Sequence, residues 1–440
     1  MNGEHESALT MRTPETAEGG VRTPVLWAFA LVVGLLAALA TTGFRWLITG
    51  VEWLGTGHTG SLVEAARHLP PWQRMLVGTV GGVLAGCVLW WGGRWAARGR
   101  SGAHHVDYIE AARRGRAELN DRTTITRSAS ALLSVATGAS IGREGAMVQL
   151  AAWFSTLLAR WAPLSLEQRN VILVSGIAAG IGAAYHAPVA GVVFVLELAL
   201  GFLSAPMVAP VMIAAATAEL VNYGIDPAPL YAAPAIRLAP AGLGMALVVG
   251  VLCGALGWFM LDLVDRLRST FSRIASLPLR LGVGGLLVGI LSAFVPEVWG
   301  NGYSTISHLL QGEIVLRWVL VILAAKFIAT LLSTGSGAIG GMFTPTLFVG
   351  ATVGFAIAGY SAAWLPAQWV TDPRTLAIIG MAAMLSAVTH APLMAIVMVL
   401  EMTSQFQFTV PVMLACGVAH AISTRFGATP MYGNPIEARH

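Results

Sequence analysis

Apolar segments of helix length recur along the whole chain, and many of them are interrupted by glycine or proline. The first runs from Val25 to Phe44. We expect thirteen further helices, at about residues 74–92, 123–137, 145–161, 169–184, 188–203, 206–223, 240–263, 280–295, 315–333, 342–364, 374–387, 391–404 and 408–424. Several are shorter than the roughly 20 residues that a helix needs to cross a bilayer. Broken helices persist in a membrane only where they line a protein or water cavity. The pattern therefore predicts an all-α polytopic membrane protein, either a transporter or a channel.

The composition supports this class. Hydrophobic residues make up 56% of the 440 residues. Charged residues make up 11%, less than half of the share of about 25% that is usual in soluble domains. So few charges exclude a soluble enzyme and a disordered chain. The net charge of +4 comes from arginines in short loops rather than on one face, so we expect no nucleic-acid partner.

Arginine distribution predicts the orientation. Residues 94–127 carry eight arginines and four acidic residues, so the positive-inside rule places this loop in the cytoplasm. Residues 1–23 are polar and mixed in charge, and we expect them to form a disordered cytoplasmic tail. A signal peptide ending near Ala38-Leu39-Ala40 is the alternative. A retained helix is preferred, because the apolar run is long for a signal peptide and the tail before it is not strongly basic.

One internal repeat stands out. Residues 176–199 read GIAAGIGAAYHAPVAGVVFVLELA and residues 380–403 read GMAAMLSAVTHAPLMAIVMVLEMT, with 11 of 24 aligned positions identical. A weaker repeat pairs residues 140–142 with residues 338–340, at nearly the same separation along the chain. The chain is therefore predicted to be a duplication with halves at about 75–220 and 280–425. In transporters built this way, the binding site lies where the repeats meet.

The sharpest local motif is GASIGREGA at residues 138–146, just before an apolar helix. A helix N-terminus offers free N–H groups and partial positive charge, and glycines let a ligand approach the backbone closely. Such a site suits an anion. Glu144 carries a carboxylate that can fill this site itself, and that can leave it when protonated. We therefore interpret Glu144 as a gate and proton carrier, with an ordinary helix-stabilising glutamate as the alternative.

Residues 335–345, GSGAIGGMFTP, form the counterpart in the second half. Four glycines and small neighbours again precede a helix start, and the N–H groups of Met342 and Phe343 could bind the same anion. Tight packing of helices through small residues is the alternative explanation. It accounts for the glycines but not for their repetition at the same place in both halves.

These segments resemble the CLC family of chloride channels and Cl⁻/H⁺ antiporters. The resemblance rests on GREGA at 142–146, GSGAIGGMFTP at 335–345, the paired HAP…E segments and Tyr432 near the C-terminus. It spans about residues 24–432 and is strongest to the bacterial ClcB-like branch, for example in the sequence WGNGY at 299–303. The short segment 433–440 then forms a C-terminal tail.

The resemblance implies a homodimer with one anion pathway in each subunit, and a CLC-type inverted-repeat fold of about 18 helices, many tilted or discontinuous. It implies that Glu144 is the external gate. The implied chloride-binding groups are the backbone at Arg143 and Gly145, the amides of Met342 and Phe343, and the hydroxyl of Tyr432. It also implies a multi-pass protein of the bacterial inner membrane with both termini in the cytoplasm.

The chain departs from the family pattern in three places. The family's GSGIP turn aligns with residues 102–106, where Ala103 replaces a serine that contacts chloride, and His104 is a possible inner-vestibule residue. Antiporters usually carry a glutamate pair in the HAP helix, but here Glu197 is followed by Leu198, so the inner proton relay is missing. The chain also stops eight residues after Tyr432, so CBS domains are not expected.

Histidine and glutamate also recur at matching places in the two halves. His186 and Glu197, like His390 and Glu401, lie 11 residues apart, or about 16 Å along one helix. One helix cannot chelate a metal with that spacing. We therefore expect structural hydrogen bonding from these residues, and neither a metal site nor a cofactor.

The sequence thus predicts chloride transport gated by Glu144. Chloride is the transported ion, and protons are the second ion if transport is coupled. Passive conduction is favoured because of Leu198, and Cl⁻/H⁺ antiport by another proton route is the alternative. A fluoride exporter is a variant within this class. An electrical shunt in acid stress is the expected physiological role. An intramembrane enzyme is not favoured, because the sequence has no HExxH motif and no serine or cysteine with a suitably placed base. A passive scaffold would not explain Glu144.

Overall fold

A computed structural model describes residues 21–98, 107–115, 117–201, 205–225, 227–233, 242–366, 369–427 and 429–433. In these residues the chain is helical, with no named strand. The α-helices are α1 (Thr23–Thr56), α2 (Leu62–His68), α3 (Pro71–Ala97), α4 (Tyr108–Arg113), α5 (Asp121–Ala136), α6 (Glu144–Arg160), α7 (Leu166–Tyr185), α8 (Pro188–Phe194), α9 (Ala205–Ile225), α10 (Gly242–Ser272), α11 (Leu277–Phe294), α12 (Tyr303–Gln311), α13 (Leu316–Gly335), α14 (Phe343–Ser361), α15 (Pro373–Thr389), α16 (Pro392–Thr403) and α17 (Thr409–Arg425).

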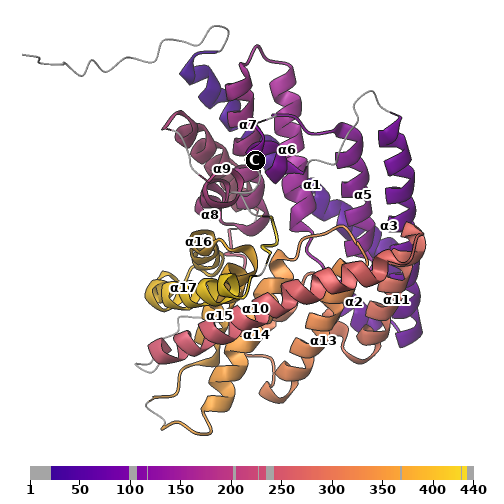
Figure 1. The fold of residues 1–440 in the computed structure, drawn as a ribbon, viewed down its shortest axis with the longest axis vertical. Helices are drawn as coiled ribbons and strands as arrows, with labels where there is room; N and C mark the ends of the chain where they lie inside the picture. The colour runs from indigo at the N-terminus through magenta and orange to yellow at the C-terminus, as the bar shows by residue number, and fades with distance from the viewer. Residues whose placement is uncertain are drawn as a thin grey trace, which may run out of the picture.

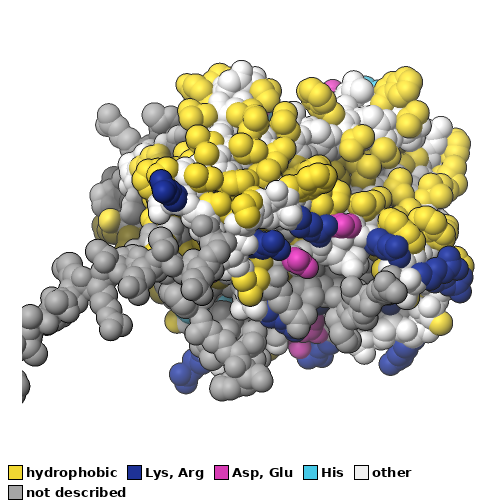
Figure 2. Space-filling model, turned by 90° about the horizontal axis from the view of Figure 1, so that it is seen from above, with side chains coloured by type: hydrophobic (Ala, Val, Ile, Leu, Met, Phe, Trp, Pro, Cys, Tyr) yellow, Lys and Arg dark blue, Asp and Glu magenta, His cyan; other side chains and the backbone are white. Residues whose placement is uncertain are grey.

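Short non-α turns complete the list of elements. A π-helix, η1 (Val195–Leu200), continues α8, and two 3₁₀ turns are η2 (Pro296–Val298) and η4 (Phe406–Phe408). Eight of the described helices are long and apolar enough to cross a membrane, and many apolar side chains on their outer faces are exposed. Figure 2 shows this apolar surface on one face of the molecule, with Lys and Arg side chains gathered along one side of it. The class predicted from the apolar runs, an all-α polytopic membrane protein, is confirmed.

The two halves use the same succession of helices. The series α3 to α9 and the series α11 to α17 match one to one, and α7 and α15 both end at a histidine with left-handed backbone, His186 (φ 53°) and His390 (φ 57°). Each histidine is followed by an Ala-Pro pair that begins the next short helix. In Figure 1 the first half occupies the indigo-to-magenta part and the second half the orange-to-yellow part, with α3 and α11 side by side.

Several helix predictions need correction; for example, the helix predicted to end at residue 263 continues in α10 to Ser272. The predicted first span ends at Phe44, but α1 continues to Thr56. Arg45 can lie inside this helix because its guanidinium finds hydrogen-bond acceptors within the protein. It donates to the carbonyls of Ala183 and Ala184 at 2.8 and 3.2 Å. The run at 188–203 is not a single α-helix, because it changes to η1 at Val195. Helices α2, α4 and α12 were not predicted, since each is too short to show a clear apolar period.

The expected N-terminal tail, residues 1–23, overlaps the described structure at its end. Val21 exchanges two hydrogen bonds with the side chain of Gln168, at 3.1 and 2.8 Å, and α1 begins at Thr23. Residues 1–20 lie outside the described residues. The start of α1 is therefore attached to the start of α7.

The duplicated glutamates join the two halves reciprocally. Glu197 accepts from the N–H groups of Leu393 (3.2 Å) and Met394 (2.7 Å) at the start of α16. Glu401 accepts from those of Val189 (3.1 Å) and Ala190 (2.7 Å) at the start of α8. Each carboxylate thus caps a helix of the other half and stabilises its N-terminus. The expectation of structural hydrogen bonding is confirmed, with the addition that the bonds run between the halves.

We predict that Glu401→Ala lowers the melting temperature of the detergent-solubilised protein. It leaves the N–H groups of Val189 and Ala190 in α8 without their acceptor, which costs about 1.5–3 kcal/mol for hydrogen bonds to a charged group. Glu167→Ala is the matched control, because Glu167 is exposed in the first turn of α7 and its loss costs only about 0.3–1 kcal/mol. Equal melting temperatures for the two variants would contradict this role of Glu401.

Candidate functional site

The two glycine-rich loops singled out in the sequence meet at the interface of the halves. Gly142 and Gly341 exchange two backbone hydrogen bonds, N to O distances 2.6 and 2.8 Å, and form an isolated antiparallel bridge. A Cβ at residue 142 would overlap the Glu144 carboxylate and lie 3.0 Å from the Gly341 carbonyl, so glycine here leaves room for both the carboxylate and the bridge. The loops precede α6 and α14, and the bridge brings the starts of these two helices together.

Both helix starts lack a capping side chain. The N-cap residues Arg143 and Met342 make no side-chain cap hydrogen bond. In contrast, Asn120 and Ser165 cap α5 and α7 with their side chains. Within the part of the chain that the structure describes, the amides of Gly145, Met342 and Phe343 donate to no protein acceptor.

These uncapped starts are also buried: Glu144 is 5% exposed, Met342 4% and Phe343 2%. Free N–H groups with the positive end of a helix dipole, away from bulk water, attract an anion. The starts of α8 and α16 differ, because Glu401 and Glu197 already supply an anion there. Two adjacent helix starts thus remain available to an anion from outside the protein.

The Glu144 carboxylate lies at this place. Its Oε1 accepts from Nδ2 of Asn301 at 2.7 Å, and its Oε2 is buried with no hydrogen-bond partner among the described residues. Oε2 lies against Gly142 of the same loop. A carboxylate with one oxygen bound and one free can take up a proton without first breaking its existing bond.

Aromatic side chains continue from the site toward the C-terminus. The rings of Tyr185 and Phe343 lie 4.8 Å apart, and those of Phe194 and Tyr432 lie 5.8 Å apart, edge to face. The side chain of Tyr432 interacts with that of Tyr108, at the start of α4. Tyr432, almost at the end of the chain, is therefore brought beside residues of the first half.

Arg113 holds this C-terminal segment in place. Its guanidinium donates to the carbonyl of Leu198 at 3.0 and 2.7 Å, and to the carbonyls of Tyr432 and Gly433 at 2.9 and 3.3 Å. A cation therefore lies beside Leu198, the position at which the resemblance led us to look for a second glutamate. Leu198 itself is 3% exposed.

Of the predicted site residues, the structure brings Arg143, Glu144 and Gly145 together with Met342 and Phe343 at the bridged loops. Tyr432 lies near Phe194 and Tyr108. Ala103 and His104 lie outside the described residues. His186 pairs with Glu219 at 3.2 Å, and Glu197 and Glu401 are occupied by backbone amides.

Sequence reasoning missed Asn301, Tyr108, Tyr185 and Arg113. Asn301 stands in the WGNGY segment that was noticed only for its resemblance, and it lies 157 residues from Glu144. Its position between two glycines was the available signal, since an amide in a glycine-rich turn is exceptional in an apolar chain. Tyr185 directly precedes the first HAP segment, but nothing local marks it as functional.

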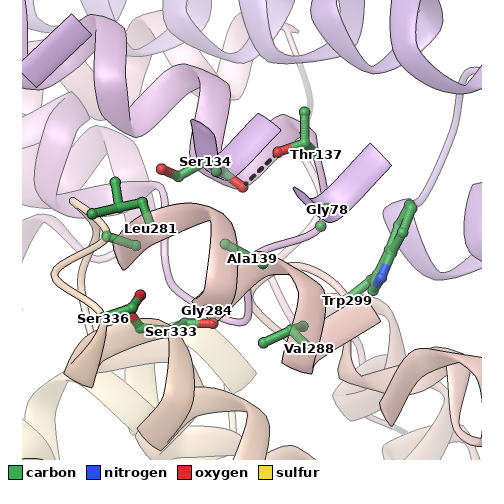
Figure 3. Close-up of a pocket in the computed structure, with 14 residues that line it drawn as sticks. Gly78, Ser134, Thr137, Ala139, Leu281, Gly284, Val288, Trp299, Ser333 and Ser336 are labelled. Carbon is green, nitrogen blue, oxygen red and sulfur yellow. Dashed lines mark hydrogen bonds between the residues drawn. The ribbon is translucent and has the colours of Figure 1, made fainter. Parts of the chain in front are cut away.

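A small cavity lies behind the two loops (Figure 3). It is lined from α3, α5, α11 and α13, and by Trp299, and its volume is about 20 Å³. Ser134 Oγ and Trp299 Nε1 are buried with no partner among the described residues. A cavity of this size has room for about one water molecule but not for a hydrated ion. Glu144, Phe343 and Tyr432 do not line it, so it is separate from the candidate anion site.

A duplicated helical membrane protein with two uncapped helix starts at its centre has the architecture of an anion transport protein. Residues 84–424 match the sequence profile of the voltage gated chloride channel family, and the chain belongs to this CLC family. This membership confirms the resemblance found in the sequence. The family consists of channels and transporters.

Relatives and solved structures agree with membership of this family. The chain is 42% identical over 427 residues to a ClcB-like chloride channel protein of Ralstonia nicotianae, covering 93% of this chain and 96% of the relative. It is 37% identical over 412 residues to the voltage-gated ClC-type chloride channel ClcB of Citrobacter koseri, covering 92% and 97%.

Among solved structures, a slow cyanobacterial Cl⁻/H⁺ antiporter matches with a TM-score of 0.80 at 22% identity, covering 94% of this chain and 97% of that one. A CLC-type fluoride/proton antiporter matches with a TM-score of 0.72 at 22% identity, covering 92% and 96%. These two structures show that the fold is the CLC fold.

Proposed function

We propose that the protein conducts chloride across the bacterial inner membrane, and that the Glu144 carboxylate gates the pathway. The observation that carries the proposal is the pair of uncapped, buried helix starts joined at Gly142 and Gly341, with Oε2 of Glu144 against Gly142. The ClcB names of the relatives at 37–42% identity support chloride as the ion.

The proposed anion contacts are backbone groups at Arg143 and Gly145, the amides of Met342 and Phe343, and the hydroxyl of Tyr432. Backbone amides suit chloride because they are fixed dipoles that need no reorganisation when the ion arrives. In this proposal, an ionised Glu144 competes with chloride for these donors. A protonated Glu144 no longer does so, and the anion enters.

Two mechanisms fit this gate. Passive conduction, regulated by voltage or pH, is favoured because Leu198 is buried and apolar where the inner proton relay of antiporters is expected, and because Arg113 places a fixed cation next to it. Cl⁻/H⁺ antiport is the second candidate, and the observation in its favour is the tyrosine series Tyr185, Tyr108 and Tyr432, whose hydroxyls can relay protons.

The remaining expectations complete the proposal. The arginines at 94–127 favour a cytoplasmic position for that loop, and the resemblance to the family favours a cytoplasmic position for both termini. The repeat halves at about 75–220 and 280–425 form one transmembrane domain, and two copies form a homodimer. The physiological role is an electrical shunt that relieves the charge built up by proton movement during acid stress.

The test is chloride efflux from liposomes that contain the purified protein, with external pH recorded at the same time. We expect rapid chloride efflux with no change of external pH, as passive conduction requires. Proton movement in fixed proportion to chloride would replace the channel by the antiporter. Absence of chloride efflux at every pH and voltage tested would contradict the proposed function.

A further inference from the structure

We propose that Asn301 is a positioning residue that holds the Glu144 carboxylate across the two helix starts and thereby sets the pH at which the pathway opens. This inference rests on the proposed function of Glu144 as the gate. The direct observation is the 2.7 Å hydrogen bond from Nδ2 of Asn301 to Oε1 of Glu144, which connects two segments 157 residues apart.

The orientation of the Asn301 amide follows from its two partners. Its Oδ1 accepts from the backbone N–H of Tyr303 at 3.1 Å, and its Nδ2 donates to Glu144. A backbone N–H can only donate and an ionised carboxylate can only accept, so the reversed amide would lose both bonds. One side chain thus shapes its own turn and contacts the gate at the same time.

The segment that carries Asn301 is fixed on both sides. Lys326, which is fully buried in α13, donates from Nζ to the carbonyls of Val298 (3.0 Å) and Gly300 (2.6 Å). Trp299 is 1% exposed and packs its ring against Gly138, where a Cβ would lie 2.5 Å from the ring. The backbone at residues 298–300 therefore has little freedom, and Asn301 holds Glu144 from a rigid support.

The hydrogen bond distinguishes the two protonation states of Glu144. A hydrogen bond to an ionised carboxylate is about twice as strong as one between neutral groups. Asn301 therefore stabilises the ionised side chain in the pathway and binds the protonated one more weakly. Protonation at the free Oε2 weakens the attachment to Asn301 and releases the side chain.

Other groups face Glu144 and are unchanged by this test. The cations near Glu144 are Arg45 and Arg143. Three tyrosines also interact with it electrostatically: Tyr185 at the end of α7, Tyr231 after α9, and Tyr432 near the C-terminus. Two acids, Glu52 and Glu219, face the arginines rather than Glu144. Of the described side chains, Asn301 alone hydrogen-bonds to the Glu144 carboxylate.

The experiment compares chloride efflux from liposomes as a function of external pH for the wild type and Asn301→Ser. Serine keeps an oxygen that can accept from Tyr303 N–H but is too short to reach Glu144. We expect the midpoint of the pH dependence to move upward by about one to two pH units, because a hydrogen bond to a charged group is lost. Asn301→Ala, which also removes the turn acceptor, is expected to give the same shift.

The background variant Glu144→Ala separates the two proposals. In that background Asn301→Ser is expected to produce no shift, since the gate is absent. The role of Asn301 would be overturned if both Asn301 variants kept the wild-type midpoint while Glu144→Ala removed the pH dependence. In that case Glu144 would still be the gate. If the pH dependence instead persisted in Glu144→Ala, the proposal that Glu144 is the gate would be contradicted. A shift of equal size with and without Glu144 would assign Asn301 a structural role and overturn the inference.

Discussion

Replacing Glu144 by alanine is expected to make chloride efflux independent of external pH and fast at neutral and alkaline pH. In the wild type the side chain of Glu144 is held by the hydrogen bond from Asn301, and it lies at the uncapped start of α6, which the Gly142–Gly341 bridge joins to the start of α14. A hydrogen bond to a charged group is worth about 1.5–3 kcal/mol, so its loss changes the population of the open pathway about tenfold to a hundredfold. We therefore expect efflux at pH 7.5 or above to rise by that factor.

The measurement is chloride efflux from liposomes between about pH 4 and pH 8, with external pH recorded. Glu167→Ala serves as the control, because Glu167 is an exposed glutamate in the first turn of a helix and belongs to no site. If the wild type moves protons, Glu144→Ala is expected to abolish that movement while chloride still passes. A variant as slow and as pH-dependent as the wild type would show that the carboxylate does not gate.

The second large effect is expected from Gly354→Ala, which should prevent stable assembly of the core. Helices α14 and α15 cross at Gly350, Gly354 and Gly380. A Cβ on Gly354 would overlap the backbone carbonyl of Leu376, and no rotamer change can relieve a clash with backbone. Overpacking a core usually costs about 1–3 kcal/mol, and we expect a value of about 3 kcal/mol or more here.

Because α14 begins at Phe343, a forced separation of α14 from α15 would also displace the proposed anion site. The readout is the melting temperature and the yield of monodisperse protein in detergent. Gly417→Ala in α17 is the control, since a Cβ there meets nothing within 4 Å and alanine favours a helix by about 1 kcal/mol over glycine. Equal yields and melting temperatures for the two variants would contradict close helix contact at Gly354.

The sequence alone was sufficient for several conclusions. The apolar runs and low charge define a helical membrane protein, because a bilayer imposes this composition on every residue that faces it. The duplication was visible because both halves retain the HAP…E segment, and the loop at 138–146 was visible because glycine, arginine and glutamate rarely occur together at the start of an apolar helix. The bounds of α6, α11, α13 and α15 were predicted to within three residues, whereas α1, α3 and α10 continue past the polar residue or glycine at which the apolar run ends.

Other features depend on contacts between distant segments. The capping of α8 by Glu401 and of α16 by Glu197 crosses more than 190 residues, and a sequence gives each glutamate no partner. The sequence also gives no partner for Lys326, which lies in an apolar run. In the structure Lys326 donates to two carbonyls of the loop at 298–300.

The sequence therefore determined the membrane class, the duplicated architecture and the position of Glu144, since these follow from local composition, periodicity and repetition. Tertiary structure alone decided which groups surround Glu144: the bridge from Gly142 to Gly341, the amide of Asn301 and the return of Tyr432 to the first half of the chain. The physical reason is that hydrogen bonds and helix contacts act over a few ångströms in space, whereas sequence patterns report only on neighbours along the chain.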